Sequence, residues 1–205
     1  ITNDSLLYQM GVHIGQQCAR MGIHINFAPD VDINNNPNNP VINFRSFGES
    51  KTNVAEKSYQ YMRGMQSQQI LTTAKHFPGH GDTDADSHKT MPLISASKNR
   101  IDTLELYPYK YLINKNLTGV MVAHLSVLVF EKNTALPSTL SPKIITDLLR
   151  NDLRFNGLIF TDALNMKGVS AYYPDGEIEV RALLAGNDVL LFTEDVPVAI
   201  NAIKK

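Results

Sequence analysis

Residues 75–88 bring many titratable side chains together, in the order Lys-His-Phe-Pro-Gly-His-Gly-Asp-Thr-Asp-Ala-Asp-Ser-His. The apolar stretch 70–74 precedes them, and Pro78 and Gly79 disfavour a helix that continues through the segment. We therefore expect a loop at the end of a strand, where catalytic side chains are often displayed. A solvated acidic turn without chemistry is the alternative.

Asp86 and His88 have the spacing of an acid–base pair. In an extended segment, residues two apart project to the same side, so the carboxylate could hold one imidazole nitrogen and leave the other for a substrate. Such a partner raises the pKa of the imidazole, which suits a general acid near neutral pH. This pair is the first candidate for proton transfer.

A metal site is a second interpretation of the same segment. His76 and His80 are four residues apart, as zinc ligands on a helix would be, but Pro78 and Gly79 lie between them and argue against that helix. A metal-dependent hydrolase stays open as an alternative, with ligands drawn from His76, His80, His88 and His124.

The composition is that of an ordinary globular domain. The 205 residues are 43% hydrophobic and 19% charged, with a net charge of -1, so no basic surface predicts nucleic acid as a partner. The longest apolar run, residues 119–130, is too short to span a bilayer. Cys18 is the only cysteine, so no disulfide can form within the chain. The expected ligand is a small or neutral molecule, and no cofactor is expected.

Short apolar runs alternate with amphipathic stretches, a pattern typical of parallel β/α units. The expected strands are five runs, at residues 23–31, 70–77, 119–125, 157–162 and 188–192. The expected helices are residues 4–21, 52–69, 98–115, 142–153 and 177–185. No internal repeat is visible, and the one biased patch is the asparagine- and proline-rich segment 34–40.

Polar side chains gather where the expected strands end: Asp30 and Asp32 in the first, Lys75 and His76 in the second, His124 in the third and Asp162 in the fourth. In barrels and in open α/β sheets, the carboxyl ends of parallel strands form the ligand-binding face. His124 could instead be a core histidine, and Asp162 could merely cap a helix. Their common position favours one site.

Five segments together resemble glycoside hydrolase family 3, and most closely its bacterial β-N-acetylglucosaminidases. They are Asn-Phe-Ala-Pro-Asp-Val-Asp at 26–32, Asn-Asn-Pro-Val-Ile-Asn-Phe-Arg-Ser-Phe-Gly at 38–48, Lys-His-Phe-Pro-Gly-His-Gly at 75–81, Asp-Ser-His at 86–88 and Phe-Thr-Asp-Ala-Leu-Asn-Met at 160–166. They occur in the family's order through nearly the whole chain. The resemblance implies a (β/α)8 barrel of the TIM type and a carbohydrate substrate.

The resemblance also implies residue roles. Asp162 would be the nucleophile of a retaining reaction, and His88, paired with Asp86, would be the general acid and then the general base. Arg45, Lys75 and His76 would hydrogen-bond sugar hydroxyls. Asp32 would shape the strand end, and Arg45 could alternatively form an ion pair with it.

The length departs from the family pattern. A complete barrel has eight strands and about 250 residues, whereas five runs are visible, and the family's Asp-x-Glu-Gly-Gly element does not occur. We therefore expect residues 1–205 to form part of a catalytic barrel domain that begins before the third strand, with further domains in the parent chain. An open sheet edge at residues 23–31 would favour self-association.

The expected activity is removal of terminal N-acetylglucosamine from peptidoglycan fragments or small glycans. Two alternatives stay open: a phosphorylase on the same site, because a neutral histidine base repels phosphate less than a carboxylate does, and a non-catalytic sugar-binding fragment. The compartment, whether cell envelope, periplasm or cytoplasm of a bacterium, stays undecided.

Overall fold

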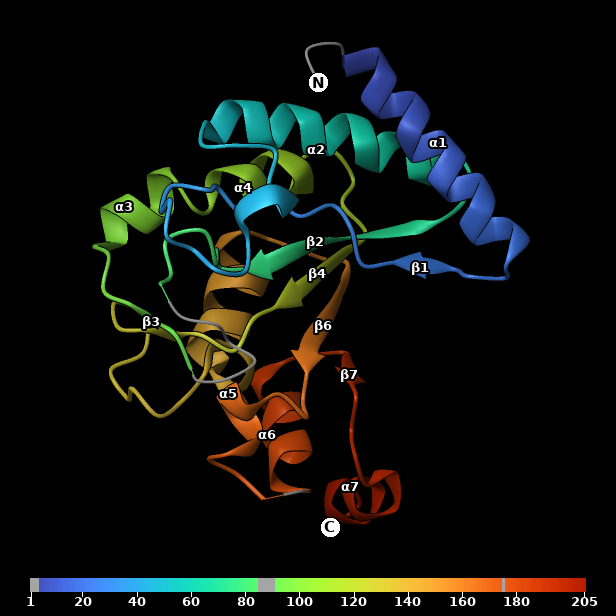
Figure 1. The fold of residues 1–205 in the computed structure, drawn as a ribbon. Coiled ribbons are helices and arrows are strands. Elements are labelled where there is room, and N and C mark those ends of the chain that lie inside the picture. Colours follow the sequence, from blue (N-terminus) through green and yellow to red (C-terminus); the bar gives the residue numbers. More distant parts are fainter. Residues whose placement is uncertain (1–3, 85–90, 175) are drawn as a thin grey trace.

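The computed structural model describes residues 4–84, 91–174 and 176–205, and its centre is one sheet of five parallel strands (Figure 1). In spatial order the strands are β1 (Ile25–Asn26), β2 (Leu71–Phe77), β4 (Gly119–Val122), β6 (Leu158–Ala163) and β7 (Val189–Leu191). Each of the five predicted runs contributes one strand. The first is much shorter than predicted, although a further bridge joins Asp30 to Lys75.

The sheet curls, and helices pack on its outer side (Figure 1). The predicted helices 4–21, 52–69, 142–153 and 177–185 correspond to α1 (Asp4–Arg20), α2 (Lys51–Gln66), the π-helical η3 (Lys143–Asp152) and α6 (Glu177–Ala185). The strands β1 and β7 form the two edges of the sheet. Among the described residues, no helix is both long enough and apolar enough to cross a bilayer.

The prediction of a single helix over residues 98–115 is wrong. The segment forms α3 (Lys98–Thr103) and α4 (Tyr107–Ile113), with residues 104–106 between them. Pro108 lies in the first turn of α4, where its missing N–H is harmless. In a continuous helix the same proline would clash with the carbonyl group four residues earlier, so the helix breaks before it.

Several short elements were not predicted. Two short strands, β3 (Leu93–Ile94) and β5 (Ser126–Val127), pair in parallel outside the main sheet. The others are the 3₁₀ turns η1 (Asn43–Arg45) and η2 (Ser138–Leu140) and the helices α5 (Lys167–Ser170) and α7 (Val196–Ile203). Most of these elements have too few residues to produce a clear hydrophobic period.

The largest core lies between the sheet and helices α2, α4 and η3. Strand β4 illustrates how the sheet divides its side chains: Val120 and Val122 belong to this core, whereas Met121 lines a cavity on the opposite face. This follows from the two-residue repeat of a strand, in which successive side chains point to opposite faces. The helix-covered face therefore stabilises the fold and leaves the inner face for a ligand.

Helices α1 and α2 approach closely because glycines face each other. A Cβ atom on Gly11 would lie 2.3 Å from the carbonyl oxygen of Tyr61, and one on Gly64 would lie 2.2 Å from that of Tyr8. Both distances are far below a van der Waals contact with backbone atoms, which cannot move aside without a shift of the helix.

We expect Gly11→Ala to destabilise the protein by about 1–3 kcal/mol, as overpacking does. On helix propensity alone, alanine would be favoured by about 1 kcal/mol, so the sign of the change separates the two effects. Gln16→Ala, at an exposed position of α1, is the control. Urea unfolding measures both variants, and an unchanged or raised midpoint for Gly11→Ala would rule out the close helix contact.

Candidate active site

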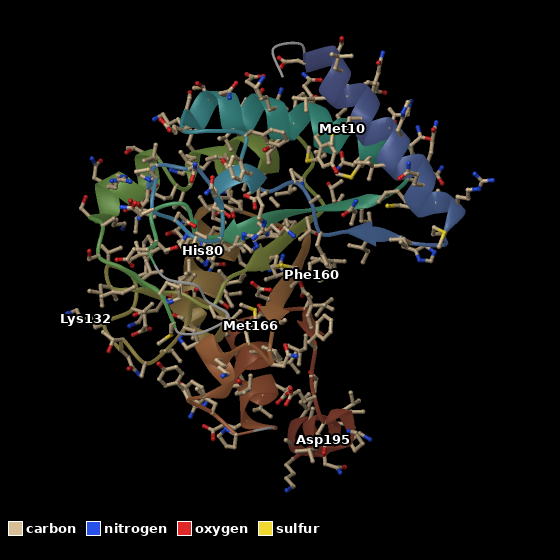
Figure 2. All side chains as sticks on the ribbon, viewed as in Figure 1. Met10, His80, Lys132, Phe160, Met166 and Asp195 are labelled. Atoms are coloured by element: carbon tan, nitrogen blue, oxygen red, sulfur yellow. The ribbon has the colours of Figure 1, made fainter. Side chains whose placement is uncertain are left out.

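A cavity of about 300 Å³ opens at the carboxyl ends of the strands. Four of the six predicted site residues line it: Arg45, Lys75, His76 and Asp162. His80, which lies beyond the end of β2 (Figure 2), and the apolar side chains of Phe27, Met121 and Phe192 complete much of its wall. The remaining two predicted residues, Asp86 and His88, lie outside the described residues.

A larger hollow, of about 660 Å³, lies at the opposite ends of the strands, beside Leu71 and Gly157. Its Arg150 is already bound to the carbonyl oxygens of Phe155 and Gly157 and to Asp188. In barrel folds the amino-terminal face serves stability and the carboxyl-terminal face carries chemistry. The smaller cavity is therefore the better candidate active site.

Asp162 occupies the end of β6, and its surroundings favour the carboxylate form. The Ala163 N–H donates a 2.8 Å hydrogen bond to Oδ1 of Asp162. Burial alone would raise the pKa of Asp162, but the nearby His76 and His124, the Ala163 N–H and the Lys75 ammonium outweigh burial and lower it below its usual value. An ionised, cavity-facing carboxylate has the form that a nucleophile needs.

His124 supports this strand end from behind. Its ring is fully buried, Nε2 lies 2.9 Å from the Ala163 carbonyl oxygen and Nδ1 lies 2.5 Å from Oγ1 of Thr139. A carbonyl oxygen can only accept, so Nε2 carries the proton. His124 is therefore buried, as one of the two sequence interpretations expected, and it also holds the residue next to Asp162, a role that the sequence did not predict.

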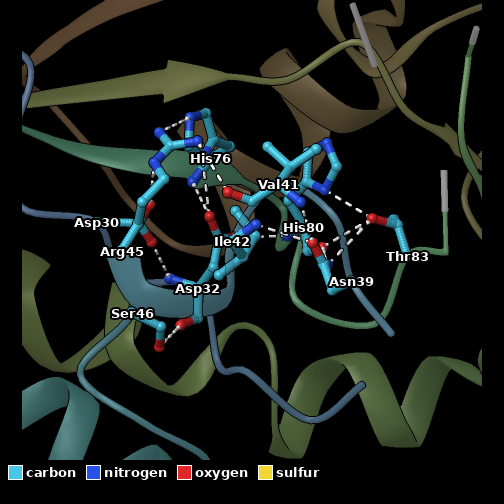
Figure 3. Close-up of polar contacts among 10 residues, drawn as sticks. All are labelled: Asp30, Asp32, Asn39, Val41, Ile42, Arg45, Ser46, His76, His80 and Thr83. Carbon is cyan, nitrogen blue, oxygen red and sulfur yellow. Dashed lines mark hydrogen bonds and ion pairs between the residues drawn. The ribbon is translucent and has the colours of Figure 1, made fainter. Parts of the chain in front are cut away.

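Arg45, Asp30, Asp32 and His76 form one connected polar network (Figure 3). Arg45 Nε lies 3.5 Å from Oδ2 of Asp30, and Arg45 Nη2 lies 3.2 Å from Nε2 of His76. The alternative that Arg45 pairs with Asp32 is therefore wrong. The Asp32 carboxylate turns into the protein, toward the backbone of residues 76–80, and leaves Asp30 to meet the guanidinium.

Burial shifts the protonation of this network. It raises the pKa of Asp30 to about 7, with the neighbouring Asp32 as a second cause, and lowers the pKa of His76 to about 4. Burial, and then the charge of Arg45, lower the pKa of Lys75. His76 is consequently neutral near pH 7, so one of its ring nitrogens accepts a hydrogen bond.

Side-chain amides of the asparagine-rich segment hold the loop that follows β2. Asn39 Nδ2 donates to the His80 carbonyl oxygen at 2.8 Å, and Asn36 Nδ2 donates to the Thr83 carbonyl oxygen at 3.1 Å. This role was missed from the sequence, where residues 34–40 stood out only by composition. The clue in the sequence was the residue type, because an asparagine amide can donate to loop carbonyl groups that have no partner in a strand or helix.

The hydrogen-bond contacts of the histidine rings leave few nitrogen atoms for a metal ion. Donor atoms of Asp30, Asp32 and His76 lie within 4.8 Å of one another. However, both ring nitrogens of His76 and both of His124 contact protein groups, and Nδ1 of His80 lies 2.7 Å from Oγ1 of Thr83. For the described candidate ligands, a set that leaves out His88, these contacts argue against the metal-dependent alternative.

The fold agrees with comparisons to known proteins. Residues 1–205 match the Glycosyl hydrolase family 3 N terminal domain, and the chain belongs to glycoside hydrolase family 3. Beta-hexosaminidase A of Pseudoalteromonas piscicida is 36% identical over 197 residues, which cover 91% of this chain and 32% of that protein.

Two solved structures have a fold similar to that of this chain. A family 3 β-N-acetylglucosaminidase from Paenibacillus sp. str. FPU-7 is 40% identical, with a TM-score of 0.95 over 98% of this chain and 39% of that one. The beta-glucoside phosphorylase BglX, solved with 2FGlc bound, is 28% identical, with a TM-score of 0.93 over 98% of this chain and 38% of that one. These similarities confirm the predicted fold class, an incomplete TIM-type barrel. The chain spans about a third of the length of the first of these relatives and about two fifths of the structures.

Proposed function

We propose that the chain is part of a retaining exo-β-N-acetylglucosaminidase, and that residues 1–205 form part of its catalytic barrel domain. The observation that carries the proposal is the meeting of Asp162, Lys75, His76 and Arg45 around one cavity at the carboxyl ends of the strands. The relatives named beta-hexosaminidase and β-N-acetylglucosaminidase support the choice of sugar. Other parts of the whole protein would complete the barrel and supply further domains.

In the first step, the Asp162 carboxylate attacks the anomeric carbon of the terminal N-acetylglucosamine. The bond from that carbon to the glycosidic oxygen breaks, and His88 donates its proton to this oxygen, so the rest of the glycan leaves as an alcohol. The products are a glycosyl ester on Asp162 and a neutral His88. The lowered pKa of Asp162 keeps it ionised for this attack.

In the second step, neutral His88 takes a proton from water while the water oxygen attacks the same carbon. The ester bond to Asp162 breaks, and its carboxylate is restored. Two inversions give net retention of the β configuration. A histidine in place of the usual carboxylic acid is the one departure from the two-carboxylate scheme.

Arg45, Lys75 and His76 would position the reacting sugar ring. Arg45 and Lys75 carry cationic donors, and the cavity wall also contains apolar side chains such as Phe27 and Met121 that suit the carbon face of a sugar. Peptidoglycan fragments and small glycans are the proposed substrates. The whole protein, assayed on nitrophenyl β-N-acetylglucosaminide beside the matching β-glucoside, tests the sugar: equal rates on both would contradict the proposal.

A phosphorylase is the second candidate function, because a similar structure is named a beta-glucoside phosphorylase. In that case phosphate, and not water, would attack the glycosyl ester on Asp162. Incubation of the whole protein with substrate and phosphate distinguishes the two. A phosphorylase accumulates N-acetylglucosamine-1-phosphate, whereas the proposed hydrolase releases free N-acetylglucosamine at an unchanged rate.

We expect Asp86→Asn to lower the rate and to shift the pH–rate profile to lower pH. The Asp86 carboxylate would raise the pKa of His88, so its removal lets the general acid lose its proton at a lower pH. Asp84→Asn, at an exposed position two residues earlier, is the matched control. A pH series of kcat/KM on the whole protein measures the shift, and an unchanged profile for Asp86→Asn would leave Asp86 a loop residue only.

A further inference from the structure

Asp32 is buried and surrounded by hydrogen-bond donors. The residue is 1% exposed, its carboxylate accepts from the His76 N–H at 3.1 Å and from the His80 N–H at 2.6 Å, and its Oδ2 lies 2.7 Å from Nδ1 of His76. It does not line the cavity. A carboxylate held by two backbone N–H groups and one imidazole ring, with no opening to the substrate, acts through those neighbours.

Two fixed partners determine which nitrogen of His76 carries the proton. Burial raises the pKa of Asp32, but the backbone N–H groups of His76 and His80 that bind its two oxygens favour the carboxylate form. A carboxylate only accepts and a guanidinium only donates. Nδ1 faces Oδ2 of Asp32, whereas Nε2 faces Nη2 of Arg45 at 3.2 Å. The Nδ1–H form satisfies both contacts, whereas the Nε2–H form would place two donors against each other and leave Asp32 with one donor fewer.

We propose that Asp32 is a positioning residue that fixes His76 in the Nδ1–H form, so that Nε2 faces the cavity as an acceptor and holds the Arg45 guanidinium in place. The proposal deepens the proposed function and rests on it for its catalytic consequence. The proposal also specifies how His76 would contact a sugar. Its Nε2 accepts a hydrogen bond from Arg45 or from a substrate hydroxyl and does not donate one.

Asp30 completes the support of Arg45 from the other side. Its Oδ1 accepts from the Asp32 N–H at 3.1 Å, and its Oδ2 lies 3.5 Å from Nε of Arg45. The Arg45 side chain is 41% exposed, so without these contacts it could adopt many rotamers. Asp30 and His76 together hold it toward the cavity that also contains Asp162.

The Asp32→Asn variant distinguishes the hydrogen-bonding role of Asp32 from a role in filling space. Asparagine has nearly the volume of aspartate, but its amide nitrogen cannot accept a hydrogen bond. Placed at Oδ1, that nitrogen would face the His80 N–H; placed at Oδ2, it would face His76, whose ring would then have to accept through Nδ1. The first arrangement would bring two donors to the 2.6 Å of the present His80 contact, so we expect the second, which puts the proton on Nε2, directly against Arg45.

The direct test is the ring ¹⁵N spectrum of His76 in the whole protein at neutral pH, assigned with a His76→Gln variant. We expect the Nδ1–H form in the wild type and its loss in Asp32→Asn. Thr83→Val, which removes the hydroxyl beside His80, is the control and should leave His76 in the Nδ1–H form. An Nε2–H or doubly protonated ring in the wild type overturns the proposal, even if Asp32→Asn does not fold.

A double-mutant cycle tests the consequence for catalysis. We expect Asp32→Asn to lower kcat/KM by about 10- to 100-fold, as loss of a supporting hydrogen bond does at other sites. On an Arg45→Ala background the same change should have a much smaller effect, because its influence passes through Arg45. Full additivity overturns the proposal. Absence of glycosidase activity in the wild type contradicts the proposed function alone, since the ¹⁵N spectrum does not depend on turnover.

Discussion

Asp162→Ala is expected to lower kcat of the whole protein on a β-N-acetylglucosaminide by at least about 1,000-fold, as removal of a catalytic nucleophile does in other enzymes. Without the carboxylate, no glycosyl ester can form at this position. The loss should appear on every substrate, whatever its leaving group, because the same bond to the anomeric carbon is needed in each reaction.

Asp147→Ala is the matched control for this variant, because Asp147 is an exposed aspartate of η3. Its activity should equal that of the wild type. Circular dichroism and the unfolding midpoint show whether Asp162→Ala keeps its fold, which we expect because the lost contact is one local hydrogen bond to Ala163. A folded Asp162→Ala variant with substantial activity would remove Asp162 as the nucleophile.

His88→Ala is expected to lower kcat/KM by about 100- to 10,000-fold on a disaccharide, and far less on a dinitrophenyl glycoside. Dinitrophenolate leaves without a proton, so the first step no longer needs an acid. Turnover should still be slow, because water attack in the second step needs the base. Azide needs no base, so it should restore turnover and give a β-glycosyl azide.

The control for this variant is His13→Ala, at an exposed position of α1. It should behave as the wild type on both substrates and show no response to azide. Equal losses on the disaccharide and on the dinitrophenyl glycoside, without rescue by azide, would contradict the acid and base assignment of His88.

The positions of the strands could be predicted because each strand is a short apolar run bounded by polar residues. Because parallel strands end on the same side of a sheet, the strand positions also predicted a common carboxyl-terminal edge. Lys75, His76 and Asp162 lie around one cavity at that edge, as expected. Arg45 joins them from η1, an element that no periodicity predicted. Only the family resemblance predicted that Arg45 belongs to the site.

The partners of individual side chains could not be predicted in the same way. Asp30 and Asp32 are two residues apart, and the sequence cannot tell which one meets Arg45 and which one turns inward. The helix break before Pro108 was in principle readable, since a proline inside a helical pattern ends or kinks the helix. The support of the loop by Asn36 and Asn39 depends on contacts across more than 40 residues of chain, which no local pattern contains.

The most direct test of the central claim is to trap the glycosyl ester. The whole protein is treated with an N-acetylglucosaminyl fluoride that has a second fluorine on the sugar ring. The anomeric fluoride leaves in the first step, and the ring fluorine slows the second step. The protein is then analysed by mass spectrometry. We predict a mass increase of one fluorinated sugar, located on the peptide that contains Asp162 and absent from Asp162→Ala. A stable adduct on any other residue, or complete turnover with inversion of the anomeric configuration, would contradict the account.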